Sequence, residues 1–275
     1  MSQIAPREAF PEHRARTDVP FFLLMGLIGA FYVGCILLML LADLAYTSPG
    51  EFLGAFAKPE IRYSLRLTMV SCTMSAILSL VFAIPIGYLM SRYRFRGRNL
   101  VDAILDIPIV LPPLVIGLSL LILFQYVPAR FTAFREAIVY QVPAVVIAQF
   151  MVACAFAVRT MRATFDQIDS RREQVALTLG CSRSQAFGLV VLPEAWRGIV
   201  TSGTLAWARA LGEFGPLLIF AGATRRKTEV LSTTVFLELS IGNLEAAVAV
   251  SLIMVASAVI VLIVARTWGT RALDP

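Results

Sequence analysis

The sequence is poor in the residues that most enzymes use for catalysis. Only one of its 275 residues is histidine, His13, and only four are cysteine. One histidine near the start of the chain argues against histidine catalysis and against a histidine-based metal site. The cysteines lack zinc-like spacing, and Cys35, Cys72 and Cys154 fall in apolar runs, so we expect no disulfides. No cofactor and no metal are predicted.

Charge is also scarce. Charged residues make up 15% of the chain and hydrophobic residues 58%, whereas soluble domains carry about 25% charged residues. This composition excludes a soluble domain and predicts a protein of the lipid bilayer. The net charge of +6 indicates attraction to anionic lipid, and no aromatic-rich basic stretch predicts nucleic-acid binding.

Catalytic signatures are missing as well. The sequence has no Walker A motif, no His-Glu-x-x-His, no Gly-x-Ser-x-Gly and no clustered aspartates in its apolar runs. The chain is therefore not predicted to be an enzyme, and any ATP hydrolysis must belong to another chain.

Six apolar runs have the length of about twenty residues that a helix needs to cross a bilayer. Backbone groups in lipid must bond within their own segment, so we predict an all-α membrane protein with six transmembrane helices. The expected spans are Pro20–Tyr46, Ser64–Met90, Val101–Val127, Ile138–Thr160, Ile199–Gly222 and Asn243–Ala265.

Arginines predict the orientation, because positive charge is retained on the cytoplasmic side of short loops. Four arginines fall in residues 91–98, between the second and third spans, and six more lie between Arg159 and Arg197. The loops on the other side have fewer basic residues. We therefore expect both termini to be cytoplasmic, in the plasma membrane of a bacterium or archaeon.

The polar segment from Gln167 to Arg197 separates two apolar spans. Glu173 to Leu179 favours helix, Gly180 permits a left-handed turn, and Ser182 can cap a second helix. A helix, a glycine turn and a helix would give a soluble partner a surface to dock on. An amphipathic helix lying on the membrane surface is the simpler alternative.

The third span contains Pro108, Pro112 and Pro113, so its helix must kink or begin anew. Backbone carbonyls freed by a broken helix are tolerated where they are buried in protein or line a water-filled path. Pro112 and Pro113 are thus candidates for a pathway lining, although prolines also occur in spans for packing reasons alone.

The fifth span carries charge into the expected hydrocarbon. Arg209 and Glu213 are four residues apart, on one helical face, where they can pair. Ser202, Gly212 and Pro216 lie on roughly the same stripe, which suits close packing or a channel wall. A purely structural ion pair would give the same pattern.

Three motifs in order resemble those of ABC-importer permeases of the molybdate, tungstate and sulfate group. They are the EAA-like register of Gln174-Val175-Ala176, Gly180, Val190 and Leu192-Pro193, the Leu111-Pro112-Pro113 run, and Arg209-Ala210-Leu211-Gly212-Glu213-Phe214-Gly215. Gln174 and Val175 depart from the EAA pattern, and the acidic residue comes one place early, as Glu173. Pro216 stands where that group usually has Ala or Ser. The likeness covers about residues 64–266.

The resemblance implies a type I ABC-importer permease fold with a cytoplasmic coupling helix. Two permease subunits, expected to be a homodimer, would form the pathway, with two cytoplasmic ATPase subunits and a periplasmic or lipid-anchored solute-binding protein. It also implies a role for two sets of residues. The ATPase-coupling residues would be Glu173, Gln174, Ala176, Gly180, Ser182, Leu192 and Pro193, and the pathway residues would be Pro112, Pro113, Ser202, Arg209, Gly212, Glu213 and Pro216.

The expected function is ATP-driven uptake of molybdate or tungstate. Sulfate, thiosulfate or another small solute is the alternative, and an ion-coupled secondary transporter is a rival, although no inverted repeat supports one. The expected organisation has four parts: a cytoplasmic tail at residues 1–19, a first span with its external loop at 20–63, a core permease domain at 64–266 and a second cytoplasmic tail at 267–275.

Overall fold

The computed structural model describes residues 19–271, and every regular element in this range is helical. The chain divides into two compact units, residues 1–46 and residues 47–275. The first unit is represented by the helix α1 (Val19–Tyr46), which matches the first predicted span. The predicted N-terminal tail with His13 and the last four residues of the C-terminal tail lie outside the described range.

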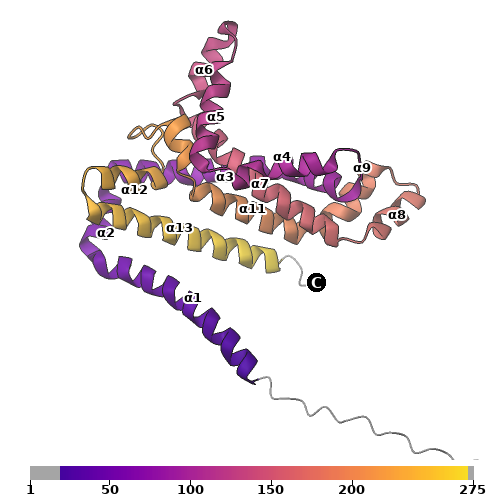
Figure 1. Cartoon of the computed structure of the whole chain (residues 1–275), viewed down its shortest axis with the longest axis horizontal. Helices are drawn as coiled ribbons and strands as arrows, with labels where there is room; N and C mark the ends of the chain where they lie inside the picture. Colours follow the sequence, from indigo (N-terminus) through magenta and orange to yellow (C-terminus); the bar gives the residue numbers. More distant parts are fainter. Residues whose placement is uncertain (1–18, 272–275) are drawn as a thin grey trace, which may run out of the picture. The chain divides into compact units, whose positions relative to one another are not determined.

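The second unit contains the remaining helices (Figure 1). In chain order they are α2 (Pro49–Ala57), α3 (Pro59–Arg92), α4 (Arg98–Val110), α5 (Pro113–Gln125), η1 (Ala129–Phe131), α6 (Thr132–Ile138), α7 (Val142–Gln167), α8 (Ser170–Thr178), α9 (Arg183–Ala186), η2 (Phe187–Val191), α10 (Leu192–Glu194), α11 (Trp196–Leu211), η3 (Leu217–Ala221), α12 (Leu231–Ser240) and α13 (Leu244–Arg271).

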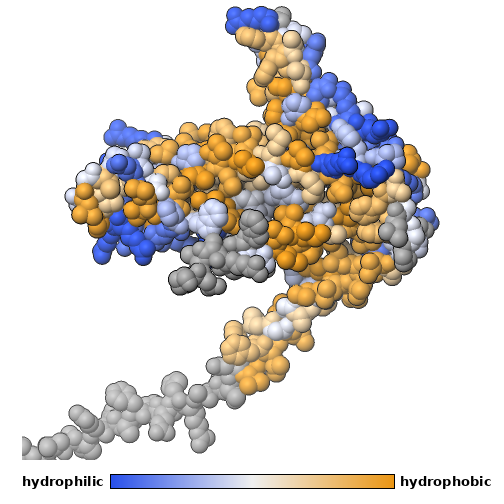
Figure 2. Space-filling view, turned by 180° about the vertical axis from the view of Figure 1, so that it is seen from behind, coloured by the Kyte–Doolittle hydropathy of each residue, from blue (hydrophilic) through white to orange (hydrophobic). Residues whose placement is uncertain are grey.

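The long helices α3 and α7 lie side by side, and α11 packs against both. Small buried residues line this contact, among them Ala76, Ala83, Ala153 and Ala157. Small side chains let helix backbones approach closely, and this is how helices associate where lipid removes the hydrophobic driving force. Figure 2 shows broad apolar surfaces over the second unit, with hydrophilic side chains gathered mainly toward its ends.

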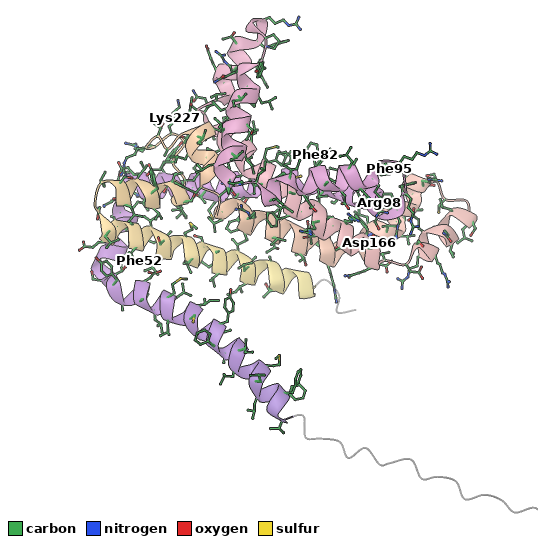
Figure 3. The ribbon with its side chains drawn as sticks, viewed as in Figure 1. Phe52, Phe82, Phe95, Arg98, Asp166 and Lys227 are labelled. Carbon is green, nitrogen blue, oxygen red and sulfur yellow. The ribbon has the colours of Figure 1, made fainter. Side chains whose placement is uncertain are left out.

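The two ends of the second unit carry different loops. Phe52 on α2 and Lys227 lie at one end, and Phe95, Arg98 and Asp166 lie at the other (Figure 3). The arginine-rich turn between α3 and α4 is at the same end as α8 and α9 (Figure 1). The two segments predicted to be cytoplasmic therefore share one end of the bundle.

By length and composition, the described helices give four membrane spans, or five if the bent pair α4 and α5 is one span, against the expected six. Four of the described helices are long and apolar enough to cross a membrane: α1, α3, α7 and α13. The third predicted span consists of two helices, α4 and α5, and the chain direction bends by 111° between them. This break is the one that the prolines predict, because Pro112 and Pro113 interrupt the hydrogen-bond ladder.

The fifth predicted span is not one continuous helix. It begins as α11, which ends at Leu211; three non-helical residues, Gly212 to Phe214, follow, and the chain becomes helical again at Gly215 and continues into the π-type turn η3. Gly212 begins this stretch and Pro216 lies just after it, and both residues disfavour a continued helix. The Ala210 carbonyl near the end of α11 accepts one hydrogen bond from the Glu213 amide and another from Nε2 of the buried Gln149 on α7, each at 3.2 Å.

Candidate functional site

The polar segment forms a helix, a glycine turn and a second helix, which we call the elbow (residues 169–194). Asp169 caps α8 by accepting a hydrogen bond from the Arg171 amide at 2.9 Å. Gly180 has φ of +92°, a left-handed conformation that side chains other than glycine rarely adopt. Ser182 and Gln185 form a reciprocal capping box at the start of α9. The predicted local structure is thus confirmed.

Glu173 joins the elbow to the end of α3. Its carboxylate accepts a hydrogen bond from the Tyr88 hydroxyl, and the Arg92 Nε lies 3.3 Å from Glu173 Oε2. Arg92 also donates from Nη2 to the Ile168 carbonyl at 3.0 Å. The Glu173 side chain is only 12% exposed, so this charge is directed into the protein and holds α8 against α3.

Aromatic side chains form a second joint between the elbow and the bundle. The Tyr88 ring packs edge-on against Phe165 on α7 and against Phe187 in η2, at centroid distances of 5.7 and 4.7 Å. Arg183 on α9 donates to the Tyr93 hydroxyl at 2.7 Å. Movement of the elbow would therefore act directly on the ends of α3 and α7.

The outer surface of the elbow exposes three large apolar side chains among polar ones. Val175, Leu179 and Leu189 are 57%, 80% and 71% exposed, although they lie in the most polar segment of the second unit. Gly180 has open space where a Cβ would lie. Exposed apolar side chains rimmed by polar ones are typical of a protein contact surface.

The other predicted coupling residues are distributed around this surface. Gln174 and Ser182 are exposed, whereas Ala176 is buried against the bundle. Leu192 is half-buried and begins α10, and Pro193 is exposed in the first turn of that helix, where a proline needs no amide partner. The predicted set therefore divides into an inner face and an outer face.

The second candidate region lies where the two broken segments cross. A Cβ on Gly117 of α5 would lie 2.7 Å from the Pro216 Cα, and a Cβ on Gly215 would lie 2.8 Å from the Leu114 amide nitrogen and 3.0 Å from the Pro113 Cβ. The two backbones are thus in direct contact at both glycines. The α4–α5 break and the α11–η3 break form one structural unit, which we call the double break.

A cavity of about 360 Å³ lies beside the double break. It is lined by Pro112, Pro113, Leu114, Arg209, Gly212, Glu213, Phe214 and Gly215. Residues predicted separately from the third and the fifth span therefore line the same cavity.

Arg209 and Glu213 provide the charges of this cavity. Arg209 Nη1 lies 2.5 Å from Glu213 Oε2, as the spacing of four residues predicts. The Glu213 side chain is 1% exposed, whereas the Arg209 side chain is 27% exposed and its guanidinium lies 5.5 Å from the Phe156 ring centroid. Both residues line the cavity, and the Arg209 side chain is the more exposed of the two.

Two predicted pathway residues lie elsewhere. Ser202 is buried and donates to the Ala157 carbonyl of α7 at 3.1 Å, which is a helix-to-helix contact. Pro216 is buried against Gly117 at the crossing. Because the chain leaves α11 at Leu211, the expected stripe from Ser202 through Pro216 does not form one helical face.

Several contacts at both regions were not predicted. Tyr88 and Arg92 hold the elbow, and Gln149 joins three helices, since Ser75 of α3 donates to its Oε1 at 3.3 Å while Gln149 itself donates to α11. Ser232 of α12 donates to the Glu213 carbonyl at 2.7 Å. The one available signal was Gln149, an amide in the middle of an apolar span.

Comparisons with known proteins agree with this architecture. The model of the family described as "binding-protein-dependent transport system inner membrane component" matches residues 83–275. The chain is 31% identical over 264 residues to the sulfate transport system permease protein CysT of Escherichia coli (strain K12), a match that covers 94% of this chain and 95% of the relative.

A second relative is the molybdate/tungstate transport system permease protein WtpB of Pyrococcus furiosus, which is 34% identical over 209 residues, 75% of this chain and 79% of the relative. Among solved structures, a chain of a bacterial alginate ABC transporter, in complex with an alginate pentasaccharide-bound periplasmic protein, superposes with a TM-score of 0.73. It is 15% identical, and the match covers 95% of this chain and 99% of that chain.

Proposed function

This chain belongs to the family of binding-protein-dependent transport system inner membrane components and is a multi-pass ABC-importer permease, and from this premise we propose that its solute is a tetrahedral oxyanion. The relatives are permeases for sulfate and for molybdate or tungstate. Molybdate or tungstate is the solute that we favour, with sulfate or thiosulfate as the alternative. Molybdate, tungstate, sulfate and thiosulfate are all tetrahedral anions that carry two negative charges.

The elbow is the proposed receiver for the ATPase subunit. Its exposed Val175, Leu179 and Leu189 supply an apolar contact surface, while Glu173 transmits force inward to Tyr88 and Arg92. This is the observation that carries the proposal. A partner can drive a conformational change only through contacts that differ between the two states, and a rigid, doubly anchored elbow supplies such contacts.

The double break is the proposed moving part of the pathway. Two broken segments cross at Gly117 and Gly215, and the Arg209–Glu213 pair lines the cavity beside them. Arg209 is the more exposed member of the pair, so it would be the group that attracts a dianion there. ATP binding would draw two elbows together and open this region to the outside, and hydrolysis would reverse the movement.

The proposed assembly has two copies of this permease, two cytoplasmic ATPase subunits and a solute-binding protein outside the membrane. The elbow end would face the cytoplasm, since residues 91–98 with their four arginines lie at the same end of the bundle. ATP hydrolysis belongs to the ATPase subunits, so this chain supplies the pathway and the coupling surface.

Replacement of Gly180 tests the coupling role. Gly180→Val should abolish ATP-dependent uptake, because a β-branched residue strains the left-handed turn by about 1–2 kcal/mol and alters the docking surface. Uptake of radiolabelled molybdate and sulfate into proteoliposomes that contain the complete transporter measures the effect. Gly188→Val is the matched control, since Gly188 also has open space but no positive φ.

Membrane insertion should be unchanged in both variants. Full uptake by Gly180→Val would remove the coupling role from the elbow. In the wild type, competition between the two labelled anions for uptake identifies the preferred solute, and uptake of neither anion would overturn the oxyanion assignment.

A further inference from the structure

An arginine-lined cavity lies between the start of α3 and the loop that follows η3. It has a volume of about 340 Å³ and is lined by Pro59, Arg62, Tyr63, Arg66 and Arg226. Lys227, which follows Arg226, lies at the end of the second unit that also carries α2 (Figure 3). We call this cavity the arginine cavity. No residue of the elbow or of the double break lines it.

The charge around this cavity is not balanced by ion pairs. Within the described range, 19–271, Arg62, Arg66 and Arg226 form no ion pair with a carboxylate. Three guanidinium groups around one cavity repel one another, and the repulsion is stronger near a low-dielectric surface than in water. A bound anion would remove this cost.

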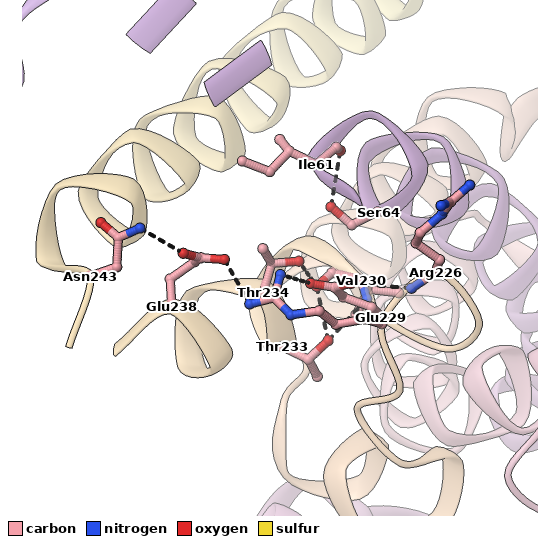
Figure 4. A network of polar contacts seen from close by, with 10 residues as sticks. Ile61, Ser64, Arg226, Glu229, Val230, Thr233, Thr234, Glu238 and Asn243 are labelled. Carbon is pink, nitrogen blue, oxygen red and sulfur yellow. Dashed lines mark hydrogen bonds and ion pairs between the residues drawn. The ribbon is translucent and has the colours of Figure 1, made fainter. Parts of the chain in front are cut away.

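Two neighbouring carboxylates, Glu229 and Glu238, are committed to other groups (Figure 4), whereas Glu60 stands beside Pro59 at the start of α3 and its charge acts on Arg225. Glu229 is fully buried, 3.7 Å from Arg225 Nη1, and one of its oxygens accepts from the Arg226 amide at 3.3 Å. Glu238 accepts from Arg225 Nη2 at 2.8 Å and from Asn243 Nδ2 at 3.1 Å. Arg225 therefore pairs with both Glu229 and Glu238. The side chain of the next residue, Arg226, forms no ion pair within residues 19–271 and lines the cavity.

The loop holds Arg226 in an unfavourable backbone conformation. Its φ is +58°, which costs about 1–2 kcal/mol for a residue with a Cβ. The Thr224 carbonyl accepts bonds from the next turn, including the Lys227 amide at 3.1 Å, and the Tyr63 hydroxyl donates to the Lys227 carbonyl at 2.9 Å. Strain of this kind persists only where surrounding contacts enforce it, and it is concentrated at functional sites.

We propose that the arginine cavity binds a tetrahedral oxyanion with two negative charges, held by Arg62, Arg66 and Arg226. Guanidinium groups bind such anions through paired N–H donors, which gives both charge and geometry. The cavity is larger than a bare oxyanion, so the ion would keep part of its water shell. The cavity would hold the oxyanion outside the membrane before it enters the pathway. This role rests on the proposed function and on the proposed orientation of the chain.

The phosphodiester of a phospholipid headgroup is also a tetrahedral oxyanion, but it carries one negative charge rather than two. The first turns of α3 lie at the level of headgroups if the 34-residue helix, about 51 Å long, crosses a hydrocarbon layer of about 30 Å. The test must therefore distinguish a free oxyanion from a bound lipid.

Direct binding to the purified permease–ATPase complex tests the proposal. In a phosphate-free detergent, without ATP and without the solute-binding protein, equilibrium dialysis with labelled sulfate and labelled molybdate measures the dissociation constant. Arg66→Gln and Arg226→Asn should each weaken binding by about tenfold or more, the usual loss for one charged hydrogen-bonding group. Asn tolerates the left-handed conformation, so the loop should keep its structure.

Arg130→Gln is the matched control, because Arg130 is an exposed arginine beside Phe131 and does not line the cavity. It should bind both anions as the wild type does. Native mass spectrometry provides the second arm. A phospholipid that the wild type retains and both cavity variants lose would show that a lipid headgroup, rather than a free oxyanion, occupies the cavity.

Absence of saturable binding of any phosphate, sulfate or molybdate species, or equal binding by the cavity variants and the wild type, would overturn the proposal. Loss of affinity for the solute-binding protein alone, with no anion bound, would also overturn it in favour of a protein contact. Because these measurements need no ATP, failure of the coupling role of Gly180 would leave the result unaffected.

Discussion

The elbow and the double break use glycine for opposite physical reasons. A Cβ on Gly180 would meet no atom within 4 Å, and the role of this glycine comes from its φ of +92°. Gly117 and Gly215 have no such φ, but a Cβ on either would meet backbone at 2.7–2.8 Å. The elbow thus needs a particular backbone shape with a free outer surface, whereas the double break needs two backbones in contact.

The elbow therefore offers a surface to a partner, whereas the contacts of the double break are made within the chain itself. At the elbow, the anchors are polar and aromatic contacts to α3 and α7, and apolar side chains remain exposed. At the double break, two backbones are in close contact and a carboxylate is buried beside a cavity. We therefore expect substitutions at the elbow to affect coupling first and those at the double break to affect folding first.

The largest loss of stability is expected at Gly117. Gly117→Ala places a methyl group 2.7 Å from the Pro216 Cα, so the two breaks must separate, at a cost of about 2–3 kcal/mol. Unfolding by SDS in mixed micelles measures the change. Gly212→Ala is the control from the same region, since its Cβ would lie 3.9 Å from the Ala208 carbonyl oxygen. Equal stability of the two variants would contradict the direct contact.

Loss of the Glu213 charge should have the next largest effect. Glu213→Gln leaves Arg209 beside the cavity without its carboxylate, and we expect a loss of about 2 kcal/mol because one member of a largely buried pair is removed. The double variant Arg209→Gln/Glu213→Gln should recover much of this stability but not oxyanion uptake. SDS unfolding measures the stability, and uptake into proteoliposomes measures the transport. Recovery of both stability and uptake would assign the pair a purely structural role.

The smallest stability effect is expected at the elbow anchor. Tyr88→Phe removes one donor to Glu173 and should cost about 1 kcal/mol, the usual value for a single hydrogen bond. Its effect on function should be larger, with ATP hydrolysed but less solute moved per ATP. Tyr93→Phe is the comparison, because it removes the hydroxyl that accepts from Arg183 and leaves the bond between Tyr88 and Glu173 in place. An unchanged ratio of transport to hydrolysis in Tyr88→Phe would contradict the anchoring role.

Local features of the fold could be predicted from the sequence, because they depend on residues close in the chain. The position of α3, though not its full length, follows from spacing and backbone chemistry, as do the break at Pro112 and Pro113, the turn at Gly180 and the pairing of Arg209 with Glu213. The early end of α11 was not predicted, since a hydrophobic run does not show where a helix stops within it.

Contacts between distant segments could not be predicted in the same way. Gly117 meets Pro216 because the packing of the whole unit brings α5 to η3, and Tyr88 meets Glu173 because it brings α3 to α8. The sequence shows that Ser202 is a small polar residue in a span, but not which neighbour it faces. Its contact with Ala157 moved it from the expected pathway into a helix interface.

The coupling role of the elbow is the central claim, and site-directed crosslinking tests it most directly. In a Cys181→Ser background, which removes the adjacent native thiol, Leu179→Cys should crosslink to the ATPase subunit in intact membranes, with a yield that changes when ATP is added. Ile241→Cys, a similarly accessible position in the turn between α12 and α13, is the control and should give no such product. Crosslinking of Leu179→Cys to lipid alone, or labelling of Leu179→Cys from outside the cell, would contradict the account.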